Sequence, residues 1–122
     1  MSKVLVIEDD EILRSAYTTK LIIEGFEVDS AVDGKEGLEK AEAGEPDLIL
    51  LDILLPIMDG VAFLTAYDIK NRHPNVKVIA FSNLSAGEKI KQVMDLGAAK
   101  FLTKATITPS EVTQIIKEEL AK

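Results

Sequence analysis

Acids, a hydroxyl and an ammonium follow the apolar runs of this 122-residue chain at four places. They are Glu8 with Asp9, Asp52, Ser82 and Lys104. Asp52 closes the apolar run 48–51 and precedes a loop that contains Pro56 and Asp59-Gly60. A carboxylate at the end of a buried strand lies at the carboxyl edge of a sheet, where open α/β sheets bind ligands and carry out chemistry. We therefore expect these side chains to gather on one edge.

Length and composition favour one soluble domain. The chain has 47% hydrophobic and 29% charged residues, and no apolar run approaches the roughly eighteen residues that a membrane span needs. Residues 1–7 are too short for a secretory signal, and zero cysteines exclude disulfides and thiolate chemistry. We expect a single cytoplasmic domain over residues 1–122, without an effector domain.

Acidic residues outnumber basic ones by 21 to 14, which gives a formal charge of −7. The excess lies in the first half, because residues 1–60 hold 15 acids and 5 bases whereas residues 61–122 hold 6 and 9. An acidic site attracts cations, and a net acidic domain binds nucleic acid poorly. The charge predicts no direct contact with DNA.

Hydrophobic periodicity and capping signals predict five strands that alternate with five helices. The expected strands cover residues 4–7, 26–31, 48–52, 76–82 and 100–103. The expected helices cover about 11–24, 33–44, 59–73, 85–97 and 108–120, the fourth with a capping box of Ser85 and Glu88. His73, at the end of the third helix, is expected to be solvated and receives no role.

Strands that alternate with helices over short connections need right-handed crossovers and a parallel sheet covered on both faces. The predicted fold is therefore a doubly wound (βα)5 domain of the α/β class, with a five-stranded parallel sheet.

The order and spacing of the polar landmarks resemble the receiver domain of bacterial two-component response regulators, of the chemotaxis-receiver type, over essentially the whole chain. The matching residues are Glu8-Asp9, Asp52, Pro56, Asp59-Gly60, Ser82, Gly97-Ala98 and Lys104. The resemblance implies a flavodoxin-like strand order of 2-1-3-4-5, of which receiver proteins are themselves a known example.

By this resemblance, Asp52 is the phosphoacceptor, and it takes a phosphoryl group from a histidine kinase or a phosphotransfer protein. The domain would be a signalling phosphoacceptor that assists its own phosphorylation and dephosphorylation, not an enzyme. A downstream protein would bind the face formed by the fourth helix, the fifth strand and the fifth helix.

The resemblance implies roles for the neighbouring residues as well. Glu8 and Asp9 would hold Mg²⁺, Ser82 would hydrogen-bond the phosphoryl group, and Lys104 would pair with it. Phe101 stands at the aromatic switch position, so that Ser82 and Phe101 together would report phosphorylation to the surface.

The chemistry of these residue types also favours a bound metal ion. Phosphoryl transfer to a carboxylate depends on positioning and on positive charge near the phosphoryl oxygens. A hard cation between Asp9, Asp52 and a backbone carbonyl, that of Leu54, would offset the repulsion of the acids, and Mg²⁺ fits these oxygen ligands. Glu8 would reach the metal through water. Asp10-Glu11, by contrast, is expected only to cap the helix that begins there.

Other classes of protein fit less well. A haloacid-dehalogenase-type phosphatase needs a second acid two residues after its nucleophile, where this chain has Leu54, and a flavodoxin needs a glycine- and hydroxyl-rich loop where it has acids. The alternative that stays open is a phosphorylation-independent pseudo-receiver, which would act as a protein-interaction module.

Three residues depart from the commonest receiver pattern: Ser82 replaces threonine, Phe101 replaces tyrosine, and Ala105 replaces the proline that follows the lysine. A cis bond before alanine costs about 2.5–4 kcal/mol. We therefore expect a trans bond between Lys104 and Ala105.

Leucine follows both the acceptor and the hydroxyl residue at a distance of two positions, as Leu54 and Leu84. Leucine offers no hydrogen bond to a water that would attack the acyl phosphate. This pattern predicts a long-lived phosphorylated state.

Overall fold

The computed structural model describes residues 2–83 and 87–122. Its five strands form one parallel sheet in the order β2-β1-β3-β4-β5, which confirms the predicted fold and strand order. The strands are β1 (Lys3–Ile7), β2 (Glu27–Ala31), β3 (Leu48–Asp52), β4 (Lys77–Ser82) and β5 (Lys100–Thr103).

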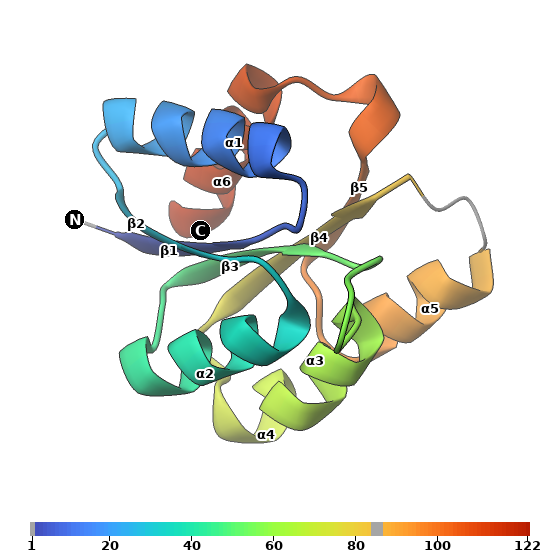
Figure 1. Cartoon of the computed structure of the whole chain (residues 1–122). Coiled ribbons are helices and arrows are strands. Elements are labelled where there is room, and N and C mark those ends of the chain that lie inside the picture. Colours follow the sequence, from blue (N-terminus) through green and yellow to red (C-terminus); the bar gives the residue numbers. More distant parts are fainter. Residues whose placement is uncertain (1, 84–86) are drawn as a thin grey trace.

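Helices cover both faces of the sheet (Figure 1). The helices α1 (Glu11–Ile23) and α6 (Pro109–Leu120) lie on one face. The other face carries α2 (Gly34–Gly44), α3 (Gly60–Tyr67), α4 (Ile69–Arg72) and α5 (Gly87–Asp95). A short 3₁₀ helix, η1 (Lys104–Thr106), follows β5. In the described part of the chain, no helix has both the length and the apolar character that crossing a membrane requires.

The central strand β3 is buried at every position because helices cover both of its faces. Leu48 and Leu50 belong to the core cluster that includes residues of α1 and α6, whereas Ile49 and Leu51 belong to the cluster that includes residues of α3. Full burial of each such side chain stabilises the fold by about 1.5–3 kcal/mol. This packing fixes the height at which β3 ends, and hence the position of Asp52.

The helix starts agree with the capping signals in the sequence. Asp10, Asp33 and Asp59 each accept a hydrogen bond from a backbone N–H three residues ahead, at 2.8–3.0 Å. Thr108 and Glu111 form the complete capping box at the start of α6. The capping role expected for Asp10 is thus confirmed. The capping box expected from Ser85 and Glu88 falls on a residue, Ser85, that lies outside the described residues.

The single third helix predicted over residues 59–73 is wrong. Asp68 adopts the left-handed conformation with φ 51°, which ends α3 and separates it from α4. The Asn71 side chain donates to the Asp68 carboxylate at 3.0 Å, so the irregular residue is tied to the turn that follows. Neither glycine nor proline marks this break, and for that reason the helical periodicity continues through it.

The expectation of a solvated His73 is also wrong. His73 is 8% exposed as a residue, and its imidazole stacks on the ring of Tyr67, with 3.9 Å between ring centroids and 5° between planes. The carboxylates of Glu42 and Glu45 lie 3.7 and 3.8 Å from its two nitrogens. The break at Asp68 turns the chain so that His73 packs back on α3 rather than projecting into water.

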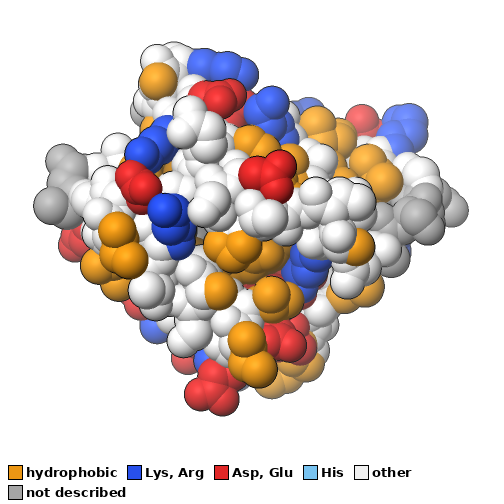
Figure 2. All heavy atoms as spheres, turned by 90° about the horizontal axis from the view of Figure 1, so that it is seen from above, with side chains coloured by type: hydrophobic (Ala, Val, Ile, Leu, Met, Phe, Trp, Pro, Cys, Tyr) orange, Lys and Arg blue, Asp and Glu red, His pale blue; other side chains and the backbone are white. Residues whose placement is uncertain are grey.

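The face covered by α1 and α6 carries charges of both signs. Figure 2 shows Lys and Arg side chains scattered among Asp and Glu on this face, with apolar side chains between them. A nucleic-acid surface is typically a stripe of positive charge. This face does not have that pattern.

Candidate functional site

The strand register brings the predicted residues to one edge. Leu51 of β3 pairs with Ile7 of β1, so Glu8, the next residue, comes beside Asp52. On the other side, Asp52 itself pairs with Phe81, which directly precedes Ser82. Ser82 in turn pairs with Thr103, which directly precedes Lys104. All strands point the same way, so these side chains meet at the carboxyl ends of the strands.

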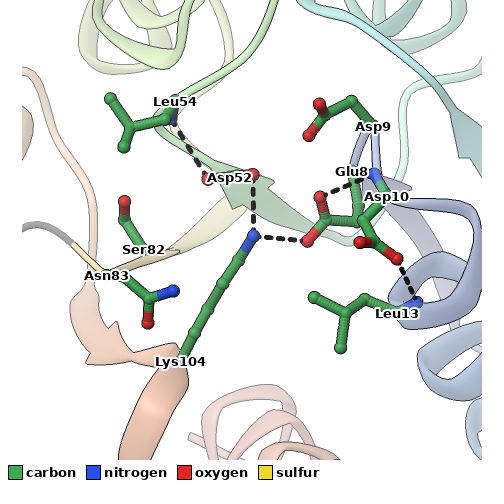
Figure 3. A pocket seen from close by; sticks show the side chains of 9 residues that line it. All are labelled: Glu8, Asp9, Asp10, Leu13, Asp52, Leu54, Ser82, Asn83 and Lys104. Carbon is green, nitrogen blue, oxygen red and sulfur yellow. Dashed lines mark hydrogen bonds and ion pairs between the residues drawn. The ribbon is translucent and has the colours of Figure 1, made fainter.

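They surround an open cavity of about 280 Å³ (Figure 3). Its lining residues are Glu8, Asp9, Asp10, Leu13, Asp52, Leu54, Ser82, Asn83 and Lys104. All the predicted site residues except Phe101 are among them. Asp10, Leu13 and Asn83 were not predicted to belong to the site, and only their nearness in sequence to Glu8, Asp9 and Ser82 could have indicated them.

Lys104 lies between two carboxylates. Its Nζ is 2.6 Å from Oε1 of Glu8 and 2.8 Å from Oδ2 of Asp52, and Figure 3 shows the side chain reaching from η1 to both. Burial, the largest influence, lowers the pKa of Lys104, but the hydrogen bonds to Asp52 and Glu8 and the two charges outweigh it and leave the pKa above its usual value. Lys104 is therefore an ammonium at neutral pH.

Glu8 is the most deeply buried acid of the site, with no exposed surface. Loss of water around its carboxylate is the largest influence and raises the pKa, the bonds from Lys104 and from the Asp10 backbone N–H lower it, and the charge of Asp52 raises it again. The net result is a pKa of about 7 against an ordinary value of 4.5. The ammonium of Lys104 thus does not fully offset the loss of water around the Glu8 carboxylate.

Asp9 completes an acidic cluster. One oxygen from each of Glu8, Asp9 and Asp52 lies within 4.8 Å of the others. Asp9 is exposed, so a cation from solvent has access to it. The Arg14 side chain donates to the backbone carbonyls of Glu8 and Asp9 at 2.9 and 3.3 Å, and so orients the loop. Three acids against one ammonium suit a hard divalent cation such as Mg²⁺.

The loop after Asp52 is held close to it. The Leu54 N–H donates to Oδ1 of Asp52 at 3.1 Å, and the Gly60 N–H donates to the Ile53 carbonyl at 2.9 Å. A Cβ on Gly60 would lie 2.7 Å from Cα of Ile53, so only glycine allows this approach. The Leu54 side chain is 55% exposed at the rim of the cavity.

A strained turn lies in the same loop and was not predicted. Ile57 has φ 68°, and the Met58 N–H donates to the Pro56 carbonyl at 2.7 Å. A bond between residues two apart around a positive φ is typical of the rare γ-turn. A β-branched residue disfavours this conformation, and Ile57 is also 80% exposed. No glycine or asparagine marks the turn, so the sequence contains no signal for it.

The two expected switch residues lie at different depths. Ser82 ends β4 and is 1% exposed, on the side of Asp52 away from Glu8 (Figure 3). Phe101 of β5 is half-buried and packs against the core cluster that includes α3 and α5 residues. The bond between Lys104 and Ala105 is trans, as predicted, since the described residues contain no cis peptide. Leu84 lies outside the described residues.

Comparison with known proteins matches residues 4–117 to the response regulator receiver domain. The chain is 34% identical over 113 residues to the transcriptional regulatory protein PrrA of Mycobacterium tuberculosis, covering 93% of this chain and 48% of that protein. It is 38% identical over 105 residues to the chemotaxis protein CheY of Treponema pallidum, covering 84% and 72%.

A solved structure of a receiver domain has the same fold as this chain. The crystal structure of a CheY-like response regulator receiver domain protein from Methanospirillum hungatei superposes with a TM-score of 0.91 at 29% identity, over 99% of this chain and 94% of that one. The chain spans about half the length of several curated relatives, PrrA among them.

Proposed function

Because the chain belongs to the response regulator receiver domain family, we propose that Asp52 accepts a phosphoryl group from a histidine kinase or a phosphotransfer protein. The observation that carries this proposal is the shared ion pair of Lys104 with Asp52 and Glu8, at 2.8 and 2.6 Å, inside a cluster of three acids. A perturbed, charged group of this kind at a sheet edge is typical of a functional site.

In the proposed transfer, an oxygen of Asp52 forms a bond to phosphorus while the bond from phosphorus to the donor's imidazole nitrogen breaks. The nitrogen keeps the electron pair and takes up a proton. Lys104 stands 2.8 Å from the acceptor carboxylate, where its charge would stabilise the phosphoryl oxygens, and the Ser82 hydroxyl would hydrogen-bond one of them. The domain is thus a signalling phosphoacceptor, not an enzyme acting on another substrate.

We assign the metal to Glu8, Asp9, Asp52 and the backbone carbonyl of Leu54, with Glu8 acting through water. Bound Mg²⁺ would supply positive charge to the transferring phosphoryl group. The fit rests on the donor set, which consists of oxygens only and carries more negative charge than Lys104 neutralises.

We propose that phosphorylation shifts the population of conformations that the domain adopts at the face formed by α5, β5 and α6, and that this shift is the output signal. Ser82 would move toward the phosphoryl group and Phe101 would turn into the space it leaves. Lys91, Lys100 and Lys89 belong to this face, and a downstream protein would bind there. We propose a cytoplasmic location and no direct contact with nucleic acid or membrane.

The slow dephosphorylation expected from Leu54 and Leu84 belongs to the same proposal. Leu54 is exposed at the rim of the cavity and presents only carbon there. Replacing Leu54 by a polar residue should therefore accelerate loss of the phosphoryl group.

Intact mass after incubation with a small phosphodonor tests the proposal. We expect the mass gain of one phosphoryl group with Mg²⁺, and none in excess chelator or in Asp52→Asn. The matched control is Asp95→Asn, which removes an exposed carboxylate on α5 that pairs with Lys91. Labelling of Asp52→Asn equal to that of the control would refute the assignment. A protein that is not labelled at all but still binds a partner would favour the pseudo-receiver.

A further inference from the structure

An aromatic ring lies against the ammonium of the site. Nζ of Lys104 is 4.9 Å from the centroid of the Phe81 ring and above its face. Phe81 belongs to β4, pairs with Asp52 across the sheet and has no exposed surface. A cation within about 6 Å of a ring centroid is attracted by the negative face of the ring. Lys104 thus contacts an aromatic ring as well as two carboxylates.

A second aromatic residue holds that ring in place. Tyr17 of α1 meets Phe81 with 5.3 Å between centroids and 83° between planes, an edge-to-face contact. Tyr17 is 3% exposed, and both residues belong to the core cluster beneath α1 and α6. Because the ring is packed on all sides, its face stays directed toward Lys104.

We propose that Phe81 is a positioning residue for Lys104, and that its ring face keeps the ammonium at the acceptor carboxylate during phosphorylation of Asp52. This inference rests on the function proposed above, since it gives the ring a role in that reaction.

The chemistry of a ring suits this task better than a third polar group would. Lys104 must leave part of its contact with Glu8 and Asp52 when a phosphoryl group and a metal arrive. Attraction to a ring face has no directional hydrogen bond to break, so the ammonium can shift toward a phosphoryl oxygen while the ring continues to shield it from water. An aliphatic residue at 81 would fill the space without attracting the charge.

Site-specific fluorination separates charge from shape. Phenylalanines with one, two and three ring fluorines have a progressively less negative face and nearly the same size. Introduced at position 81, they should lower the rate of phosphorylation by a small phosphodonor step by step, to a total loss of about 3-fold or more. The same series at Phe63 is the control, because Phe63 is equally buried and stacks on Tyr67 at 5.5 Å. Equal effects at both positions, or none at 81, would overturn the proposal.

A second measurement does not depend on phosphorylation. In the native protein, the ring current of Phe81 should shift the NMR signals of the Lys104 ε-methylene protons upfield, and Phe81→Leu should remove that shift while the signals of Lys100 stay in place. Unshifted Lys104 protons in the folded native protein would refute the contact. If the native protein shows the shift but no phosphorylation, the proposed function fails and the aromatic contact stands.

Discussion

Glu8 should reduce the stability of the domain when no metal is bound. Its pKa is about 7 in the folded chain, against an ordinary 4.5, chiefly because burial removes water from the carboxylate. The folded state therefore binds this proton more tightly than the unfolded state does. The contribution of Glu8 to stability is complete below about pH 4.5 and is lost as pH rises through 7. Glu8→Gln removes the titrating group and should remove this loss.

The size of the effect follows from the two pKa values. Each tenfold difference in proton affinity is worth about 1.4 kcal/mol. Ionisation of Glu8 thus costs the folded state about 1 kcal/mol at pH 5.5 and about 3 kcal/mol at pH 8. In the absence of metal, Glu8→Gln should be more stable than the native protein by these amounts. The gain should therefore grow by about 2 kcal/mol between the two pH values.

Urea unfolding in the presence of a chelator measures this difference. Circular dichroism is the suitable signal because the chain contains no tryptophan. The lower pH of 5.5 is chosen because it stays above the sequence pI of about 4.7. The matched control is Glu27→Gln, an exposed glutamate of β2 that pairs with β1. A gain for Glu8→Gln that is the same at both pH values, or a loss at pH 8, would refute the reasoning.

Three further changes test the loop and a helix end by urea unfolding. Ile57→Asn should stabilise the domain by about 1 kcal/mol, because asparagine tolerates a positive φ; no gain would show that Ile57 is not strained. Gly34→Ala should destabilise it by about 2–3 kcal/mol or more, because a Cβ there would lie 1.9 Å from the Met58 carbonyl oxygen; a native-like midpoint would mean that the loop yields easily. Thr108→Ala should cost about 1 kcal/mol by removing the cap on α6, and Thr106→Ala, which loses no cap, serves as its control.

The sequence predicted those features of the fold and the site that depend on local or strongly repeated patterns of residues. The starts of α1, α2, α3 and α6 were predictable because each helix has a capping side chain that accepts a hydrogen bond from the backbone N–H three residues ahead. Each signal is therefore contained in four consecutive residues. The gathering of Glu8, Asp52 and Lys104 followed from the parallel arrangement of strands, because their ends share one edge whatever the details of packing.

The parts that were missed depend on contacts between distant segments or on unusual backbone. Asp68 and Ile57 adopt left-handed conformations that their residue types do not favour, so the surrounding packing must determine them. His73 is buried because Tyr67 stacks on it after the chain has turned. Phe81 lies in a strand that is buried on both faces, where alternation of residue types does not reveal which side chain faces the site.

The negative charge that suits the site to a cation also destabilises the metal-free domain. Two buried carboxylates share one ammonium, and the third acid, Asp9, is exposed beside them. Removing the charge of Glu8 should stabilise the metal-free domain, yet it also removes part of the negative charge that attracts a divalent cation. A ligand that binds only the folded state stabilises it in proportion to the logarithm of its concentration. Mg²⁺ should therefore raise the melting temperature of the native protein more than that of Glu8→Gln. At pH 8, the advantage in stability that Glu8→Gln has without metal should shrink or reverse as Mg²⁺ is added. If Mg²⁺ stabilised both equally, the instability of the free site would have no connection with metal binding.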